Sequence, residues 1–233
     1  MDKGKAVMGT GRRWAVVSKE LNACHRKVSL DRNLRLFLFF LRAMLIYSVA
    51  YDLRHMENMP ALVEASVCIT TGVTQKFLKA LTSVHCLSLY LSFSEVVHPS
   101  GMIFNQLVHL DLYTFTEGWW DLLTCMLQDS PKLRLLKLSN NKLRSESKET
   151  PIGRRRPSSV PECLLSSLEA FVWIGYNGRQ GDREMAIYLL KNTACLKTAT
   201  FSPDSTDLGE KYQMLKVLAS VATTSASSQL LFD

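Results

Sequence analysis

Six short runs of the chain share one spacing of apolar residues. In each run an apolar residue stands at the first, fourth and sixth places, as Leu133, Leu136 and Leu138 do in LRLLKLSNN. The runs begin at residues 62, 84, 107, 133, 168 and 196, so successive runs start 22, 23, 26, 35 and 28 residues apart. The fourth and sixth places are two residues apart and lie on one face of a β-strand. The pattern predicts six strands that share a buried face.

Between the runs, apolar residues recur with the three- and four-residue spacing of a helix. This spacing occurs over 74–81, 119–127 and 184–190. A fourth helix is predicted over 208–218, where Ser205-Thr206-Asp207 supplies residue types that favour a helix N-cap. At Trp119 and Trp120 we expect one ring in the core and the other partly exposed.

The spacing and the period are those of leucine-rich repeats, which run for about 20–29 residues around an L-x-x-L-x-L core. Leu138-Ser139-Asn140-Asn141 matches the polar turn that follows this core. One unit cannot bury its apolar face alone, whereas stacked units form a continuous core. We therefore predict an α/β fold, a leucine-rich-repeat-like solenoid of about six strand–helix units with a curved, mainly parallel sheet.

Three glycines follow the fifth run, at Gly175, Gly178 and Gly181, and an amphipathic stretch comes after them. Strand, glycine loop and helix is also the order of a phosphate-binding loop. However, G-x-x-G-x-x-G matches neither G-x-G-x-x-G nor G-x-x-x-x-G-K-[ST], and no Lys-Ser or Lys-Thr follows Gly181. We interpret the glycines as positive-φ residues of a strand-to-helix turn, and Asp182 as a helix cap.

The net charge of +7 is concentrated near the N-terminus. Residues 1–60 hold 11 Lys and Arg against 5 Asp and Glu, while residues 61–233 hold 17 against 16. A nucleic-acid-binding module carries its basic patch on the folded domain, so this distribution does not favour a nucleic-acid partner.

The residue types that carry chemistry are scattered. The six cysteines include no C-x-x-C pair, which disfavours a zinc site and indicates a reduced protein of the nucleus or cytoplasm. The five histidines form no cluster, and neither a G-x-S-x-G nor an H-E-x-x-H motif occurs. We predict no catalytic residues, no metal ligands and no cofactor.

Two further segments carry alternative interpretations. Residues 34–50, LRLFLFFLRAMLIYSVA, follow several basic residues, as a membrane anchor would, but Arg35 and Arg42 leave clean stretches shorter than the ~20 residues of a span. We favour a buried or poorly folded segment. Residues 142–160, rich in charge, Ser and Pro, predict a surface loop, and Arg154-Arg155-Arg156 in it could serve nuclear import or contact an acidic partner.

Four stretches and the last six residues carry a resemblance to a known family. They are ENMPALVEASV (57–67), FLKALTSVHCLSLYLSFSEV (77–96), residues 103–141, residues 157–203 and SQLLFD (228–233). Together they make residues 51–233 resemble the plant F-box/FBD/leucine-rich-repeat proteins, and residues 157–203 are similar to the FBD domain. The resemblance implies four regions: a basic and apolar leader (1–50), repeats (51–141), the Ser/Pro loop (142–160) and an FBD domain (161–233).

The resemblance also implies a role as substrate receptor of a Skp–cullin–F-box ubiquitin ligase. In that family an F-box binds a Skp-type adaptor and the repeats bind a target. Residues 1–50 contain no Leu-Pro-led helical segment ending in Lys-Arg-Trp, so we expect no adaptor binding. The alternatives are a truncated or degenerate family member without a ligase role and a variant anchored to a membrane through 34–50. The predicted function is a protein-interaction module for an unknown protein target, with partner-facing strand residues His109, Asp111, Lys137, Val172 and Ile174.

Overall fold

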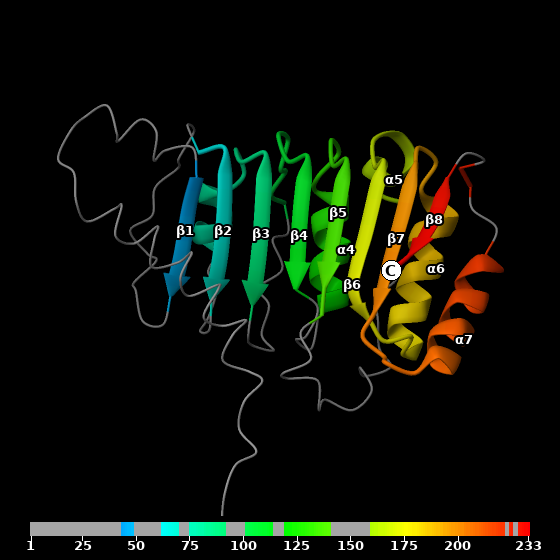
Figure 1. Ribbon diagram of the computed structural model, residues 1–233. Coiled ribbons are helices and arrows are strands. Elements are labelled where there is room, and N and C mark those ends of the chain that lie inside the picture. Colours follow the sequence, from blue (N-terminus) through cyan, green and yellow to red (C-terminus); the bar gives the residue numbers. More distant parts are fainter. Residues whose placement is uncertain are drawn as a thin grey trace, which may run out of the picture. The chain divides into compact units, whose positions relative to one another are not determined.

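A computed structural model describes residues 43–48, 62–69, 75–91, 101–113, 119–140, 159–221, 224–225 and 228–233, all within one compact unit. These residues build an eight-stranded sheet in which the strands lie in their order along the chain, each parallel to the next (Figure 1). The predictions of a mixed α/β fold and of a parallel sheet are confirmed. The strands are β1 (Ala43–Ser48), β2 (Glu64–Ile69), β3 (Cys86–Leu91), β4 (His109–Tyr113), β5 (Leu135–Ser139), β6 (Ala170–Tyr176), β7 (Thr198–Pro203) and β8 (Gln229–Phe232).

Helices of the described residues lie on one side of the sheet (Figure 1). The four predicted helices are confirmed, with ends that differ by a few residues. A fifth, α5, was not predicted, because five residues are too few to show a helical period. The helices are α3 (Gln75–Ala80), α4 (Trp119–Gln128), α5 (Glu162–Ser166), α6 (Gln180–Asn192) and α7 (Leu208–Ala219).

The apolar places of the six runs form one core. All eighteen residues at these places, three in each of six runs, are buried and belong to one hydrophobic cluster. The strand register explains why. Leu110, Leu136 and Phe171 are direct neighbours on β4, β5 and β6, and so each strand continues the apolar row of the one before it. The prediction that the strands share one apolar interior is confirmed.

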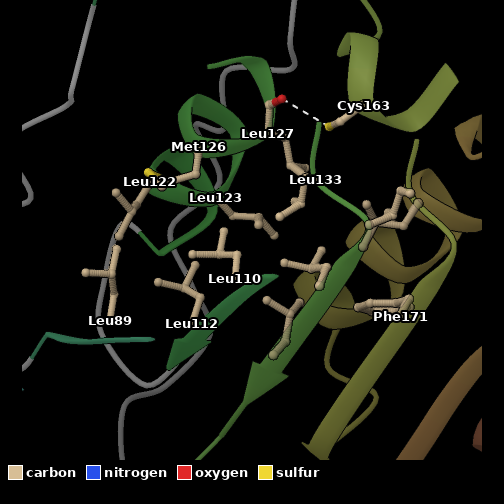
Figure 2. Close-up of a cluster of buried hydrophobic side chains, with 14 of the residues drawn as sticks. Leu89, Leu110, Leu112, Leu122, Leu123, Met126, Leu127, Leu133, Cys163 and Phe171 are labelled. Atoms are coloured by element: carbon tan, nitrogen blue, oxygen red, sulfur yellow. Dashed lines mark hydrogen bonds between the residues drawn. The ribbon is translucent and has the colours of Figure 1, made fainter. Parts of the chain in front are cut away.

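Helix α4 covers the middle of this core. Its residues Leu122, Leu123 and Met126 are buried, and Figure 2 shows them beside Leu110 and Leu112 of β4. The apolar residues of the helix, which recur about every 3.6 positions, thus pack against the apolar residues of the strand, which recur every two positions.

Both tryptophans at the start of α4 are in the core, so the prediction that one ring is partly exposed is wrong. Trp119 is 4% exposed and Trp120 is 7% exposed. Adjacent helical residues are 100° apart, and the buried sector of this helix is wide enough to include both. The ring of Trp119 lies edge-on to Trp120 and to Trp173 of β6, with centroid separations of 5.9 and 5.8 Å.

The sheet has two strands more than the six predicted. β8 pairs with β7, placing Leu230 and Phe232 beside Ala199 and Phe201. At the other edge, β1 pairs with β2. Strand β1 is part of the apolar segment 34–50. The rest of that segment lies outside the described residues. Among the described helices, none combines the length and the apolar composition needed to cross a bilayer.

The glycine turn follows the prediction at two of its three glycines. Gly175 and Gly178 have φ values of +73° and +61°. Gly181, in contrast, lies in the first turn of α6 and is not among the positive-φ glycines. Asp182 is not the N-cap residue, because Arg179 holds that position. Instead the Asp182 side chain accepts a hydrogen bond of 3.4 Å from the Arg179 backbone N–H, as the acidic member of a capping box does.

The predicted loop at 142–160 lies outside the described residues except for 159 and 160, and so does its arginine triplet. The sheet itself continues across this interval, because β5 pairs directly with β6. Residues 1–42 of the predicted leader also lie outside the described residues. The four predicted regions, the curvature of the sheet and its assignment as a leucine-rich-repeat solenoid stay predictions.

Candidate interaction face of the sheet

The sheet face opposite the core, which we call the outer face, is lined by the alternate residues of each strand. Side chains there form rows that run across the strands, because the parallel register is continuous. None of the residues of the middle row belongs to the hydrophobic cluster. From β2 to β8 this row holds Ser66, Ser88, Asp111, Lys137, Val172, Thr200 and Leu231.

The structure brings the five predicted partner-facing residues together on this face. Asp111, Lys137 and Val172 are direct neighbours on β4, β5 and β6. His109 lies two residues before Asp111, and Ile174 lies two residues after Val172, so both share the same face. We call these five residues the outer-face patch. Its members come from segments far apart in the sequence.

Asp111 is less exposed than predicted. Its exposed fraction is only 8%, because neighbouring side chains cover the carboxylate. Lys137 Nζ donates a hydrogen bond of 2.8 Å to Asp111 Oδ2, and Ser139 Oγ donates one of 3.4 Å to Asp111 Oδ1. The side chain of Lys137 is 31% exposed, against 11% for Asp111. The solvent-facing group of this pair is therefore an ammonium held in place by a shielded carboxylate.

His109 contributes a second polar group to the patch. It is half-buried, and its register neighbours are Cys86 of β3 and Leu135 of β5. Its Nε2 atom is buried and makes no hydrogen bond within the part of the chain that the structure describes. A buried ring nitrogen without a hydrogen bond is unfavourable.

A cluster of three charges, which the sequence analysis did not single out, joins the starts of β5, β6 and β7. Arg134 Nε donates a hydrogen bond of 3.0 Å to Glu169, and Lys197 Nζ donates one of 2.7 Å to the same carboxylate. These hydrogen bonds, from Lys197 first and then Arg134, hold the pKa of Glu169 below its usual value. Arg, Glu and Lys occupy the second places of the last three runs, so alternating charge at one place of a repeat is the signal that could have found them.

The outer face becomes more apolar toward β8. Ile174 of β6 is 42% exposed and Leu231 of β8 is 45% exposed. Thr200 stands between Val172 and Leu231 in the middle row. The face thus combines an ion pair at β4 and β5 with exposed aliphatic groups at β6 and β8, which suits recognition of a protein surface. Leu231 could not be predicted, because β8 itself was not.

The described residues offer little for bond-making chemistry. No group of three His, Cys, Asp or Glu side chains among them is placed to hold a metal ion. The Cys163 thiol is buried and donates a hydrogen bond of 3.1 Å to the Leu127 carbonyl, and burial raises its pKa to about 12. Burial also raises the pKa of Cys86 and Cys125. Nucleophilic cysteines need a lowered pKa instead.

A parallel sheet with helices on one face and mixed polar and aliphatic residues on the other, among the described residues, defines a mixed α/β protein. Comparison with known proteins gives the family. The FBD family model matches residues 156–201, which include α5, β6 and α6. The chain belongs to the family of plant F-box/FBD/LRR-repeat proteins.

Three Arabidopsis thaliana relatives, each described as an F-box/FBD/LRR-repeat protein, illustrate the match. One is 61% identical over 224 residues, which is 95% of this chain and 52% of the relative. A second is 45% identical over 77% of this chain and 42% of its own length. A third is 43% identical over 75% of this chain and 40% of its own length. The chain thus spans about half the length of the relatives it matches, or less. No solved structure shows a significant match.

Proposed function

We propose that this chain is the substrate-recognition part of an F-box-type protein, a leucine-rich-repeat-like solenoid that binds a protein target of a ubiquitin ligase through its outer face. The observation that carries the proposal is the outer-face patch, which the register assembles from β4, β5 and β6 on the face opposite the core. The names of the relatives support the class of function. The protein acts in the nucleus or the cytoplasm.

Adaptor binding is a separate property. The chain by itself does not bind a Skp-type adaptor, since no F-box pattern is recognisable in residues 1–50. Isothermal titration calorimetry of the purified chain with a purified Skp-type adaptor tests this directly. Micromolar or tighter binding would show that the adaptor-binding function is present in this chain.

Target binding is tested with one pair of matched variants. Ile174→Asp places a charge on the outer-face patch, and Ile103→Asp places the same charge on another exposed isoleucine, outside the strands. Both side chains are exposed, at 42% and 57%, and neither belongs to the hydrophobic cluster. Each tagged chain and the wild type are expressed in Arabidopsis tissue, and the proteins that copurify are compared by quantitative mass spectrometry.

We expect at least one protein to copurify with the wild type and with Ile103→Asp but not with Ile174→Asp. That protein, purified, should bind the wild-type chain directly and lose at least about tenfold in affinity with Ile174→Asp, as for an exposed aliphatic contact placed at the centre of an interface. If the three chains copurify the same proteins in the same amounts, the outer face is not the target site.

A further inference from the structure

Helix α7 is attached to the rest of the protein by one side. Leu218 is its buried residue, 1% exposed, and Met214 is a partly buried residue that packs against the same hydrophobic cluster. Val221, just past the helix, also packs there. Because Met214 and Leu218 are four residues apart, they mark one side of the helix. In Figure 1, α7 lies next to α6 at the end of the helix layer.

A second apolar stripe runs along α7 on a different side. Leu208, Tyr212, Leu215 and Ala219 follow one another at spacings of four, three and four residues, which places them in one line along a helix. Leu208 is 82% exposed and Tyr212 is 60% exposed, the two highest values among the large apolar residues of the described chain. Leu215 is half-buried and Ala219 is exposed. We call these four residues the α7 stripe.

Two lysines flank the stripe. At 100° per residue, Lys211 and Lys216 lie about 70° to either side of its centre line. Neither forms an ion pair with any residue that the structure describes. The one acidic residue of the helix, Glu210, lies away from the stripe and accepts a hydrogen bond of 2.6 Å from Ser205. The surface is therefore an apolar line bordered by positive charge on both sides.

We propose that the α7 stripe binds an amphipathic helix of a partner protein whose own apolar stripe is bordered by acidic residues. The spacing of the stripe is the one at which two helices interlock side by side. The helix has 12 residues and is about 18 Å long, enough for three turns of contact. Glutamates beside the partner's apolar line would lie opposite Lys211 and Lys216. This site is separate from the outer-face patch and does not rest on the function proposed above.

Charge disfavours two other occupants. In a pair formed by two copies of α7, neither Lys211 nor Lys216 would find an acidic residue opposite, since Glu210 lies away from the stripe. The chain's own first 60 residues carry 11 basic against 5 acidic residues, so they also lack the complementary charge. A partner helix with acidic residues beside its apolar stripe supplies the negative charge that both of these occupants lack.

The test uses the full chain and two synthetic peptides. Both carry leucines at four-three-four spacing on an alanine-rich helix. One has glutamates flanking the leucines and the other has lysines. Each peptide is labelled with a fluorophore, and binding is measured by fluorescence anisotropy. We expect the glutamate peptide to bind at least about tenfold more tightly than the lysine peptide, from two exposed charge pairs that change from attraction to repulsion.

Variants locate the binding. Leu208→Ser with Tyr212→Ser should weaken binding of the glutamate peptide at least about tenfold, whereas Leu165→Ser, at a leucine 54% exposed on α5, should leave it unchanged. Lys211→Glu with Lys216→Glu should reverse the preference between the two peptides, and Lys132→Glu, in an exposed turn, should not. The melting temperature of each variant, which should stay within about 2 °C of the wild type, checks that the fold is retained.

Four results would overturn the proposal. They are the absence of binding, equal binding of the two peptides, binding that the α7 variants do not weaken, and a concentration-dependent dimer in analytical ultracentrifugation that Leu208→Ser with Tyr212→Ser dissociates. The last result would assign the stripe to a second copy of the chain. Because Ile174→Asp leaves α7 intact, it should bind the peptide normally, so failure of one proposal is distinguishable from failure of the other.

Discussion

At the scale of single residues, Gly175 occupies a position that side chains do not fit. Its φ is +73°, and a Cβ atom built there would lie 2.7 Å from the carbonyl oxygen of Asn140. The Asn140 backbone N–H in turn donates to the Ile174 carbonyl over 2.9 Å. A side chain at 175 would therefore push apart two backbone segments that are hydrogen-bonded to each other.

We expect Gly175→Ala to lower the free energy of unfolding by about 2–4 kcal/mol. The alanine must hold a strained positive φ, and the backbone at Asn140 must also move away from the new Cβ atom. Gly101→Ala is the control. Gly101 has a φ of +79°, but nothing lies within 4 Å of a Cβ built there, so the φ strain alone should cost about 1 kcal/mol. Urea denaturation measures both. Equal losses in the two variants would mean that the close approach to Asn140 contributes nothing.

At the scale of elements, charged side chains link strands that are distant in sequence. Glu169, which precedes β6, receives hydrogen bonds from Arg134 before β5 and Lys197 before β7. The side chains of Arg134 and Lys197 are largely exposed, at 61% and 68%, so solvent and salt weaken these ion pairs. We therefore expect these ion pairs to contribute little to total stability.

The pKa of Glu169 reports this link. Because the folded pKa is lowered, the stabilisation is present at pH values above the unfolded pKa and is lost as the pH falls through the folded pKa. An NMR titration should give a pKa below that of an ordinary glutamate, and Lys197→Met should raise it. Lys132→Met, which removes a lysine outside this cluster, should leave it unchanged. An ordinary pKa in the wild type would mean that the cluster does not form in solution.

At the scale of the whole molecule, the parallel register makes one core out of successive repeats. Phe171 lies in this core between Leu136 of β5 and Ala199 of β7. The centroid of its ring is 5.5 Å from that of Phe201 and 6.0 Å from that of Trp173. The apolar row of each strand lies beside those of the neighbouring strands, so loss of packing at one strand affects the strands next to it.

We expect Phe171→Ala to lower the free energy of unfolding by about 3–5 kcal/mol, because it leaves a cavity in this shared core. Ile174→Ala, on the same strand but on the outer face, should cost less than about 1 kcal/mol. In the wild type, unfolding followed by tryptophan fluorescence and by far-ultraviolet circular dichroism should coincide. Fluorescence changes that precede the loss of secondary structure would instead indicate repeats that unfold independently.

The sequence by itself determined the buried positions of six strands and the order of those strands with four of the helices. Apolar residues at the first, fourth and sixth places can share a buried side in a short strand that follows a turn, and all eighteen residues at these places are buried. The positive φ of Gly175 and Gly178 was also predictable from the local sequence, because it depends on the turn in which these glycines lie.

Only the tertiary structure decided the number of strands and the exposure of the outer face. β1 and β8 are strands because neighbouring strands supply hydrogen bonds and, for β8, an apolar row, which four residues such as QLLF do not reveal alone. Asp111 is shielded because the parallel register places Lys137 and Ser139 beside it, although they are 26 and 28 residues away in sequence. Apolar spacing is a property of one segment, whereas shielding depends on which other segment lies next to it.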